Sequence, residues 1–117
     1  MTTETKRPGE HGLVAMEVAL SVVEQMREAV GVVRRHDAEL ARQMTRAASS
    51  IVANVAEGSR RVGRDRLHLF RIAAGSAEET RAHLRVALAW GYLESSAIQA
   101  SLSLIDRELR LLWGLTH

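Results

Sequence analysis

The chain of 117 residues has no cysteine, one proline and only four aromatic side chains. Without cysteine it can form no disulfide, no thiolate metal site and no thiol nucleophile. All-β proteins favour β-branched and aromatic residues in strands and place proline and glycine in their turns, so this composition argues against them. Alanine, leucine, arginine and glutamate predominate instead, and all four are strong helix formers. The sequence therefore predicts an all-α protein.

Long apolar runs and targeting segments are also missing. No run approaches the roughly 20 apolar residues that a membrane-spanning helix needs. The first twelve residues, MTTETKRPGEHG, contain charges of both signs and lack the apolar stretch of a signal peptide. We expect residues 1–12 to form a flexible N-terminal arm and residues 13–117 to form one domain, because a chain of this length cannot bury two sizeable cores. The expected location is the cytoplasm.

Apolar residues recur every three or four positions in four segments, which is the spacing of an amphipathic helix. The segments run from Leu13 to Arg35, from Ala38 to Glu57, from Arg64 to Trp90, and from Ser96 onward. The connections between them are short, which favours an antiparallel up-down-up-down four-helix bundle. The predicted inner rows are, in chain order, Ala15, Val18, Val22, Met26, Ala29 and Val33; Leu40, Met44, Ala47, Ile51 and Val55; Leu67, Phe70, Ala73, Ala77, Thr80, Leu84, Ala87 and Leu88; Ile98, Leu102, Ile105, Leu109 and Leu112.

Several residues predict where these helices begin and end. Asp37 is placed to cap the start of the second helix, and Ser96 with Gln99 matches a capping box at the start of the fourth. Gly58 is expected to end the second helix in the left-handed conformation. Gly75, inside the third helix, would cost about 1 kcal/mol relative to alanine. We therefore expect a close helix crossing at Gly75.

The fourth helix carries a second apolar row, which one bundle does not need. Burying one leucine is worth roughly 1.5–3 kcal/mol, so leaving such a row in water would be costly. A neighbouring copy of the chain is the simplest partner, and we expect a homo-oligomer. The row consists of Ala97, Leu104, Leu111 and Leu115.

Four polar residues lie beside the apolar rows: Asn54 and Glu57 in the second helix, Ser76 and Glu79 in the third. The turn between these helices can bring the two pairs together. Buried polar groups need partners, so we expect a structural hydrogen-bond network that fixes the helix register. The alternative is that the carboxylates form an acid/base or metal site.

Known catalytic and metal-binding patterns are absent. Di-metal bundles present Glu-x-x-His on two helices, whereas here the one close pair is Glu79 and His83, spaced i, i+4. There is no glycine-flanked serine elbow and no phosphate-binding Gly-x-x-x-x-Gly-Lys loop. We therefore expect no metal, no cofactor and no enzymatic activity.

Arginine supplies fifteen of the sixteen basic residues, and residues 34–85 contain eleven arginines against six acids. Guanidinium groups bind phosphate in two-point contacts, so this segment predicts sequence-independent contact with nucleic acid. A GC-rich genome would produce the same arginine excess without a function. The aromatic residues are too few to predict base stacking as a main mode. The candidate residues are Arg42, Arg46, Arg60, Arg61, Arg64 and Arg66.

Three stretches resemble the motifs of a bacterial family of four-helix bundle proteins, the 23S ribosomal RNA intervening-sequence proteins. Residues 43–58, QMTRAASSIVANVAEG, match Q-x-x-R-A-x-x-S-I-x-x-N-I-A-E-G except for Val55. Residues 69–80, LFRIAAGSAEET, resemble the family's F-L-x-x-A-x-G-S-x-x-E-x, and residues 88–93, LAWGYL, resemble its L-G-Y-[IL]. In place of the family's Pro-x-x-Glu before the second helix, the chain has HDAE at residues 36–39.

The family is similar to the accessory variability determinant of diversity-generating retroelements, a basic homopentamer of four-helix protomers that binds nucleic acid and a reverse transcriptase. The resemblance therefore implies a non-enzymatic homo-oligomer, most simply a pentamer, with RNA or DNA and a reverse transcriptase as partners. The family's Asn and Glu motif residues correspond to Asn54, Glu57 and Glu79. The competing hypothesis is a scaffold or adaptor that binds another protein and no nucleic acid.

Overall fold

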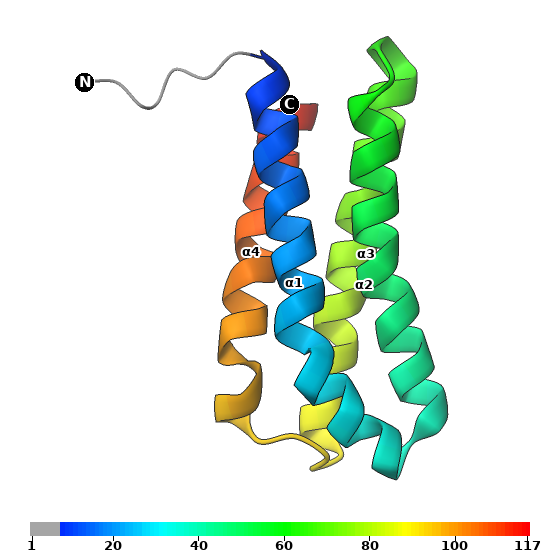
Figure 1. The fold of residues 1–117 in the computed structure, drawn as a ribbon, viewed down its shortest axis with the longest axis vertical. Helices are drawn as coiled ribbons and strands as arrows, with labels where there is room; N and C mark the ends of the chain where they lie inside the picture. The colour runs from blue at the N-terminus through cyan, green and yellow to red at the C-terminus, as the bar shows by residue number, and fades with distance from the viewer. Residues whose placement is uncertain (1–7) are drawn as a thin grey trace, which may run out of the picture.

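The computed structural model describes residues 8–117, with side chains from residue 12 onward. It contains α1 (Pro8–His36), α2 (Ala38–Ser59), α3 (Gly63–Ala89) and α4 (Ser95–Thr116). The helices alternate in direction, α1 and α3 each pack beside α2 and α4, and the described residues form no strand (Figure 1). This arrangement is the predicted antiparallel four-helix bundle. No helix of the described chain is long and apolar enough to cross a membrane.

The N-terminal boundary differs from the prediction. Helix α1 begins at Pro8, five residues before the expected start at Leu13. Residues 8–12 therefore belong to the helix, where proline is tolerated because the first turn needs no N–H donor from it. The remainder of the expected arm, residues 1–7, lies outside the described residues.

The core is formed by one apolar stripe from each helix. In α1 and α2 every residue of the predicted inner rows is buried. In α3 the row is confirmed from Phe70 to Ala87, whereas Leu67 is half-buried and Leu88 is exposed. The largest fully buried apolar side chains are Met26, Met44, Ile51, Phe70, Leu84, Ile98, Ile105 and Leu112.

In α4 the predicted inner row is confirmed at Ile98, Ile105 and Leu112 and was wrong at its other two positions. The buried stripe contains Ser101 and Glu108 where the prediction had Leu102 and Leu109, which are half-buried beside it. The physical reason is that α4 has apolar rows on both sides of the 101/108 stripe. The middle of this wide apolar arc faces the core, and the two leucine rows flank it.

The second apolar row of α4 is less exposed than we predicted. Leu104, Leu111 and Leu115 are half-buried and pack against the core of their own chain. Leu104 still borders an open groove of about 850 Å³ between α1 and α4. The α1 helix therefore covers part of this row.

The two predicted helix starts have different outcomes. Asp37 caps α2 as predicted, accepting a hydrogen bond from the backbone N–H of Leu40 at 3.0 Å. The capping box at Ser96 was wrong, because α4 begins at Ser95 after an extended Glu94. The amide of Gln99 instead donates to Ser95 Oγ at 3.1 Å.

The two predictions about Gly58 and Gly75 were also wrong. Gly58 lies inside α2, which ends one residue later at Ser59, and its φ is not positive. A Cβ at Gly58 would lie 2.7 Å from Cε1 of Phe70, so it is the ring of Phe70 that requires glycine there. Gly75 is exposed, and a Cβ at this position would meet nothing within 4 Å. The close approach within the chain is therefore at Gly58.

Glu108 is the one ionisable side chain buried in the core of the described chain. Its exposed fraction is 0%, and neither carboxyl oxygen has a hydrogen-bond partner among the described residues. Burial raises the pKa of the Glu108 carboxyl from 4.5 to about 8, an effect that the positive charge of Arg107 opposes only in part. Ser101, two turns earlier on the same stripe, also has a buried hydroxyl without a partner there.

Candidate nucleic-acid interface

The six candidate arginines form two separate groups and not one surface. Arg42 and Arg46 lie in the first half of α2, whereas the other four lie at or just after the α2–α3 turn. The fourteen residues from Arg46 to Arg60 correspond to about 21 Å along a helix axis. A ligand bound by one group would therefore have to extend along the bundle to reach the other.

The first group borders a groove between α1 and α2. The groove has a volume of about 610 Å³ and is lined by Arg34, Ala38, Arg42, Thr45, Arg46 and Ser49. Arg34 belongs to the last turn of α1, which also contains Arg35 and His36. Arg34 was not among the predicted residues, although it belongs to the arginine-rich segment. The sequence does not show which residues of α1 face α2.

Charge is unevenly neutralised in this groove. The guanidinium of Arg42 lies 2.6 Å from a carboxyl oxygen of Glu39. Hydrogen bonds from Arg42 and, to a lesser degree, from Gln43 hold the pKa of Glu39 at about 2, below its ordinary 4.5. Arg34 and Arg46 form no ion pair with any residue whose side chain the structure describes. These two guanidiniums are the ones available to an anion.

The second group is more engaged in contacts of its own. Arg61 lies 3.3 Å from Glu57 and 3.9 Å from Asp65. The Arg66 guanidinium lies 5.0 Å from the centre of the Phe70 ring and is half-buried, so it packs on the core end. Arg60 and Arg64 are exposed, and neither is ion-paired within residues 12–117.

The predicted polar network exists in part. Asn54 Nδ2 donates to the backbone oxygen of Ser50 at 2.8 Å and to Ser50 Oγ at 3.0 Å. Ser76 Oγ donates to the same Ser50 Oγ at 2.9 Å, which links α3 to α2. The hub, Ser50, was missed, although it occupies a fixed position of the motif.

Glu57 and Glu79 do not belong to this network. Both side chains are 55% exposed, and each contacts a residue one turn away on the exposed side of the bundle, Arg61 and His83 respectively. The contact between Glu79 and His83 is 3.2 Å long. Glu57 directly precedes buried Gly58, and Glu79 directly precedes buried Thr80, so both side chains lie beside the buried stripes and not within them. No three His, Asp or Glu residues in the described chain are placed to hold a metal ion together.

The groove of α1 and α2 is therefore a concave surface that carries unpaired positive charge. Its guanidiniums can each donate two hydrogen bonds to a phosphate, and the Ser49 hydroxyl can donate one. Its lining contains no aromatic side chain on which a base could stack. Chemically, the groove is suited to a chain of phosphates.

Comparison with known proteins places the chain in one family. No curated protein matches the sequence. A solved structure of a protein of unknown function from the S23 ribosomal protein family of Bacteroides thetaiotaomicron is similar, with a TM-score of 0.82 and 18% sequence identity over 91% of this chain and 97% of that one. At that identity the likeness shows the fold alone. The 23S rRNA-intervening sequence protein family matches residues 13–114, nearly the whole four-helix bundle, and the chain therefore belongs to this family.

Proposed function

We propose that this protein is a non-catalytic, homo-oligomeric four-helix bundle that binds RNA or DNA through the phosphate backbone. The supporting observation is the groove between α1 and α2, where Arg34 and Arg46 have no described ion-pair partner. Phosphate contacts position a nucleic acid without reading its sequence. The protein is therefore expected to bind many sequences with similar affinity.

Replacing Arg34 and Arg46 together with alanine tests this proposal. Each guanidinium that contacts a phosphate displaces a condensed counterion, which contributes about 0.9 to the slope of log affinity against log salt on duplex DNA and about 0.7 on single strands. The double variant is expected to bind more weakly at every salt concentration, with a slope on duplex shallower by about 1.8. Fluorescence anisotropy with a labelled RNA and a labelled duplex measures both quantities.

A matched control removes the same charge elsewhere. Arg85 of α3 and Arg107 of α4 are exposed and lie on the helices that do not form the groove. Their joint replacement with alanine is expected to leave the salt slope nearly unchanged. If both double variants weaken binding equally, net charge and not the groove is responsible. A third variant, with Arg60, Arg61 and Arg64 replaced by alanine, measures the contribution of the α2–α3 turn.

The proposal includes an oligomer, a pentamer by resemblance to the retroelement protein, and a reverse transcriptase as protein partner. The groove between α1 and α4 has a polar side, which includes Glu24, Arg27 and Glu28, and an apolar side formed by Val32, Leu93, Ala97 and Leu104, and self-association would bury the apolar side. Leu13 and Leu20 of α1 are also exposed. Light scattering at micromolar concentration is expected to report several protomers per particle. A particle with the mass of one chain would contradict this part of the proposal.

The second candidate function is a scaffold that binds another protein and no nucleic acid. The observation that favours it is that Arg42, Arg61 and Arg81 are each paired with an acidic residue. The binding measurement separates the two functions. Absence of binding to RNA and to duplex, even at low salt, would leave the scaffold as the better explanation.

A further inference from the structure

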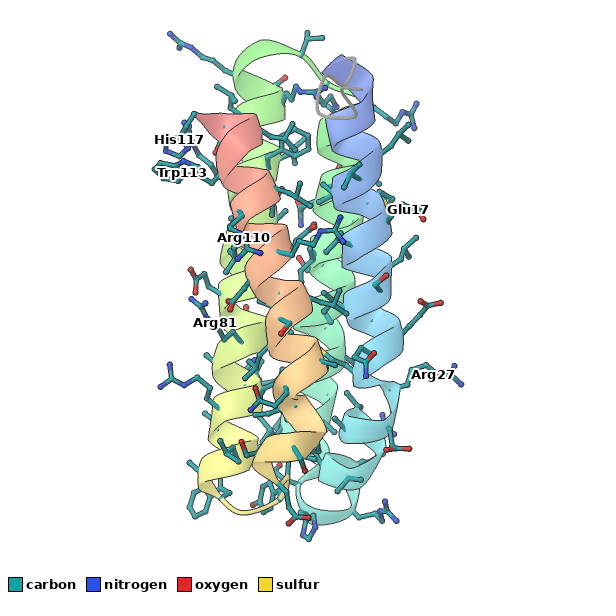
Figure 2. All side chains as sticks on the ribbon, turned by 90° about the vertical axis from the view of Figure 1, so that its left-hand side faces the viewer. Glu17, Arg27, Arg81, Arg110, Trp113 and His117 are labelled. Carbon is teal, nitrogen blue, oxygen red and sulfur yellow. The ribbon has the colours of Figure 1, made fainter. Side chains whose placement is uncertain are left out.

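An exposed aromatic pair lies near the end of α4. The side chain of Trp113 is among the most exposed large apolar groups of the described chain, at 64%. The His117 ring stacks on it, with ring centroids 3.3 Å apart and an angle of 18° between the planes. Figure 2 shows Trp113 and His117 projecting together, away from the bundle. With His117 stacked on one face, a ligand that stacks on the indole would use the opposite face or take the place of His117.

The surroundings of this pair carry positive charge. Trp113 and His117 border a groove of about 280 Å³ between α3 and α4, and Arg71 lies on its α3 side. Arg110 precedes Trp113 by three residues, so the two side chains lie on the same face of α4 (Figure 2). Neither arginine forms an ion pair with another residue whose side chain the structure describes.

The acidic residue in this groove is already neutralised. Glu78 is ion-paired with Arg81, whose guanidinium also lies 2.9 Å from Asp106 of α4. Arg71 therefore has no competing unpaired carboxylate in the groove lining. The floor is apolar and includes Leu109 and Leu112. An exposed indole that shares a groove with Arg71 and has Arg110 one turn away on α4 is suited to a ligand that has both a flat aromatic group and a negative charge.

We propose that this groove, the Trp113 platform, binds an unpaired nucleotide: the base stacks on Trp113, and the adjoining phosphates contact Arg71 and Arg110. The inference rests on the proposed nucleic-acid function and adds a second contact site to it, because the end of α4 and the α1–α2 corner that carries Arg34 lie at opposite ends of the bundle (Figure 1). Bases in a duplex already stack on each other, so a platform of this kind selects single strands. The end of α4 and the α2–α3 turn, which carries Arg60 and Arg64, lie at the same end of the bundle (Figure 1).

Tryptophan fluorescence tests the platform directly. The chain has two tryptophans, so a Trp90→Phe background leaves Trp113 as the single reporter. Three probes of about twelve nucleotides, a length within the range of known single-strand sites, are compared: oligo-dT, the same strand without bases, and a duplex. Oligo-dT is expected to quench the fluorescence of Trp113 strongly, and the abasic strand, which has the same phosphates, only weakly.

The Trp113→Ala variant, with Trp90 retained, measures the energetic contribution. Loss of one stacked base is expected to weaken binding of oligo-dT about tenfold and to leave the abasic strand and the duplex within about twofold. Trp113→Phe is expected to recover part of the loss, because phenylalanine keeps an aromatic face. Circular dichroism checks that each variant is folded.

Two results would overturn the inference while leaving the proposed function intact. One is binding of all three probes with no difference between oligo-dT and the abasic strand. The other is a Trp113→Ala variant that binds oligo-dT as well as the parent, or weakens all three probes alike. If no probe binds even at low salt, the proposed function fails together with the inference, and Trp113 is then better explained as an anchor for a protein.

Discussion

Replacing Glu108 with leucine is expected to stabilise the fold by about 3 kcal/mol at pH 7. Burial raises the pKa of this carboxyl from 4.5 to about 8, so the folded chain retains a proton that the unfolded chain releases. Each factor of ten in proton affinity corresponds to about 1.4 kcal/mol. At pH 7 the ionised unfolded chain is favoured by this amount for every pH unit above its pKa of 4.5, which gives the estimated destabilisation by Glu108. Leucine has no charge to desolvate. Urea unfolding monitored by circular dichroism measures the change.

The same residue predicts how stability depends on pH. Between about pH 4.5 and pH 8 the folded state holds one proton more than the unfolded state at Glu108, so its contribution lowers the free energy of unfolding as pH rises. Below 4.5 both states are protonated, and above 8 both are ionised, so the contribution is constant there. Glu108→Gln cannot ionise and is expected to remove this slope from the difference between variant and parent.

An exposed glutamate provides the control. Glu28 of α1 is exposed, and Glu28→Gln is expected to change neither the stability nor its pH dependence by more than about 0.5 kcal/mol. Parallel pH profiles of the parent and Glu108→Gln would contradict the assignment, since they would mean that Glu108 titrates equally in both states.

Replacing Gly58 with alanine is expected to destabilise the fold by about 2 kcal/mol. The new methyl group would lie 2.7 Å from Cε1 and 2.8 Å from Cδ1 of Phe70, and 3.3 Å from Cβ of Leu69. Phe70 is fully buried among core side chains, so its ring must shift within the packed core, and overpacking of this kind costs about 1–3 kcal/mol. The higher helix propensity of alanine offsets up to about 1 kcal/mol of the cost. Thermal unfolding reports the net effect.

Gly75 offers the same substitution with the opposite expected sign. It lies inside α3 with open space around the position of a Cβ, so Gly75→Ala is expected to stabilise the chain by about 0.5–1 kcal/mol. Equal effects of the two substitutions would show that the packing of Phe70 against Gly58 does not determine the outcome. A destabilising Gly75→Ala would indicate that another copy of the chain approaches α3 closely at this point.

The fold could be predicted from the sequence because the helix pattern is strong and local. In α1 and α2 a single apolar stripe faces the core, and spacing alone identified it. In α4 two leucine rows flank the true inner stripe, so spacing favoured the row at Leu102 and Leu109 over the one that contains Glu108. A buried, unpaired carboxylate is costly, and for this reason no pattern-based argument would place one there.

The sequence predicted which residue type would form the candidate site but not which of these residues lie together. The arginine-rich segment indicated phosphate binding, but the length of α2 separates its members, and Glu39 and Phe70 engage Arg42 and Arg66. Arg34 joins the groove only because α1 packs against α2 in one particular rotation. Trp113 was counted among too few aromatics to matter, since its exposure depends on which face of α4 is buried. These contacts and exposures depend on how the helices pack against one another, which the local sequence pattern does not show.

The connection between α1 and α2 consists of one residue, Asp37, with an extended backbone at φ −155° and ψ 94°. A connection of one residue cannot accommodate an insertion or a deletion without moving one helix relative to the other. One residue inserted there would turn the faces of α2 by about 100° relative to α1, carrying Arg46 away from Arg34 and the core stripe away from its partners. Length variation among homologues should therefore be confined to the other two connections, residues 60–62 and 90–94, while the α1–α2 corner stays at fixed length and preserves the groove.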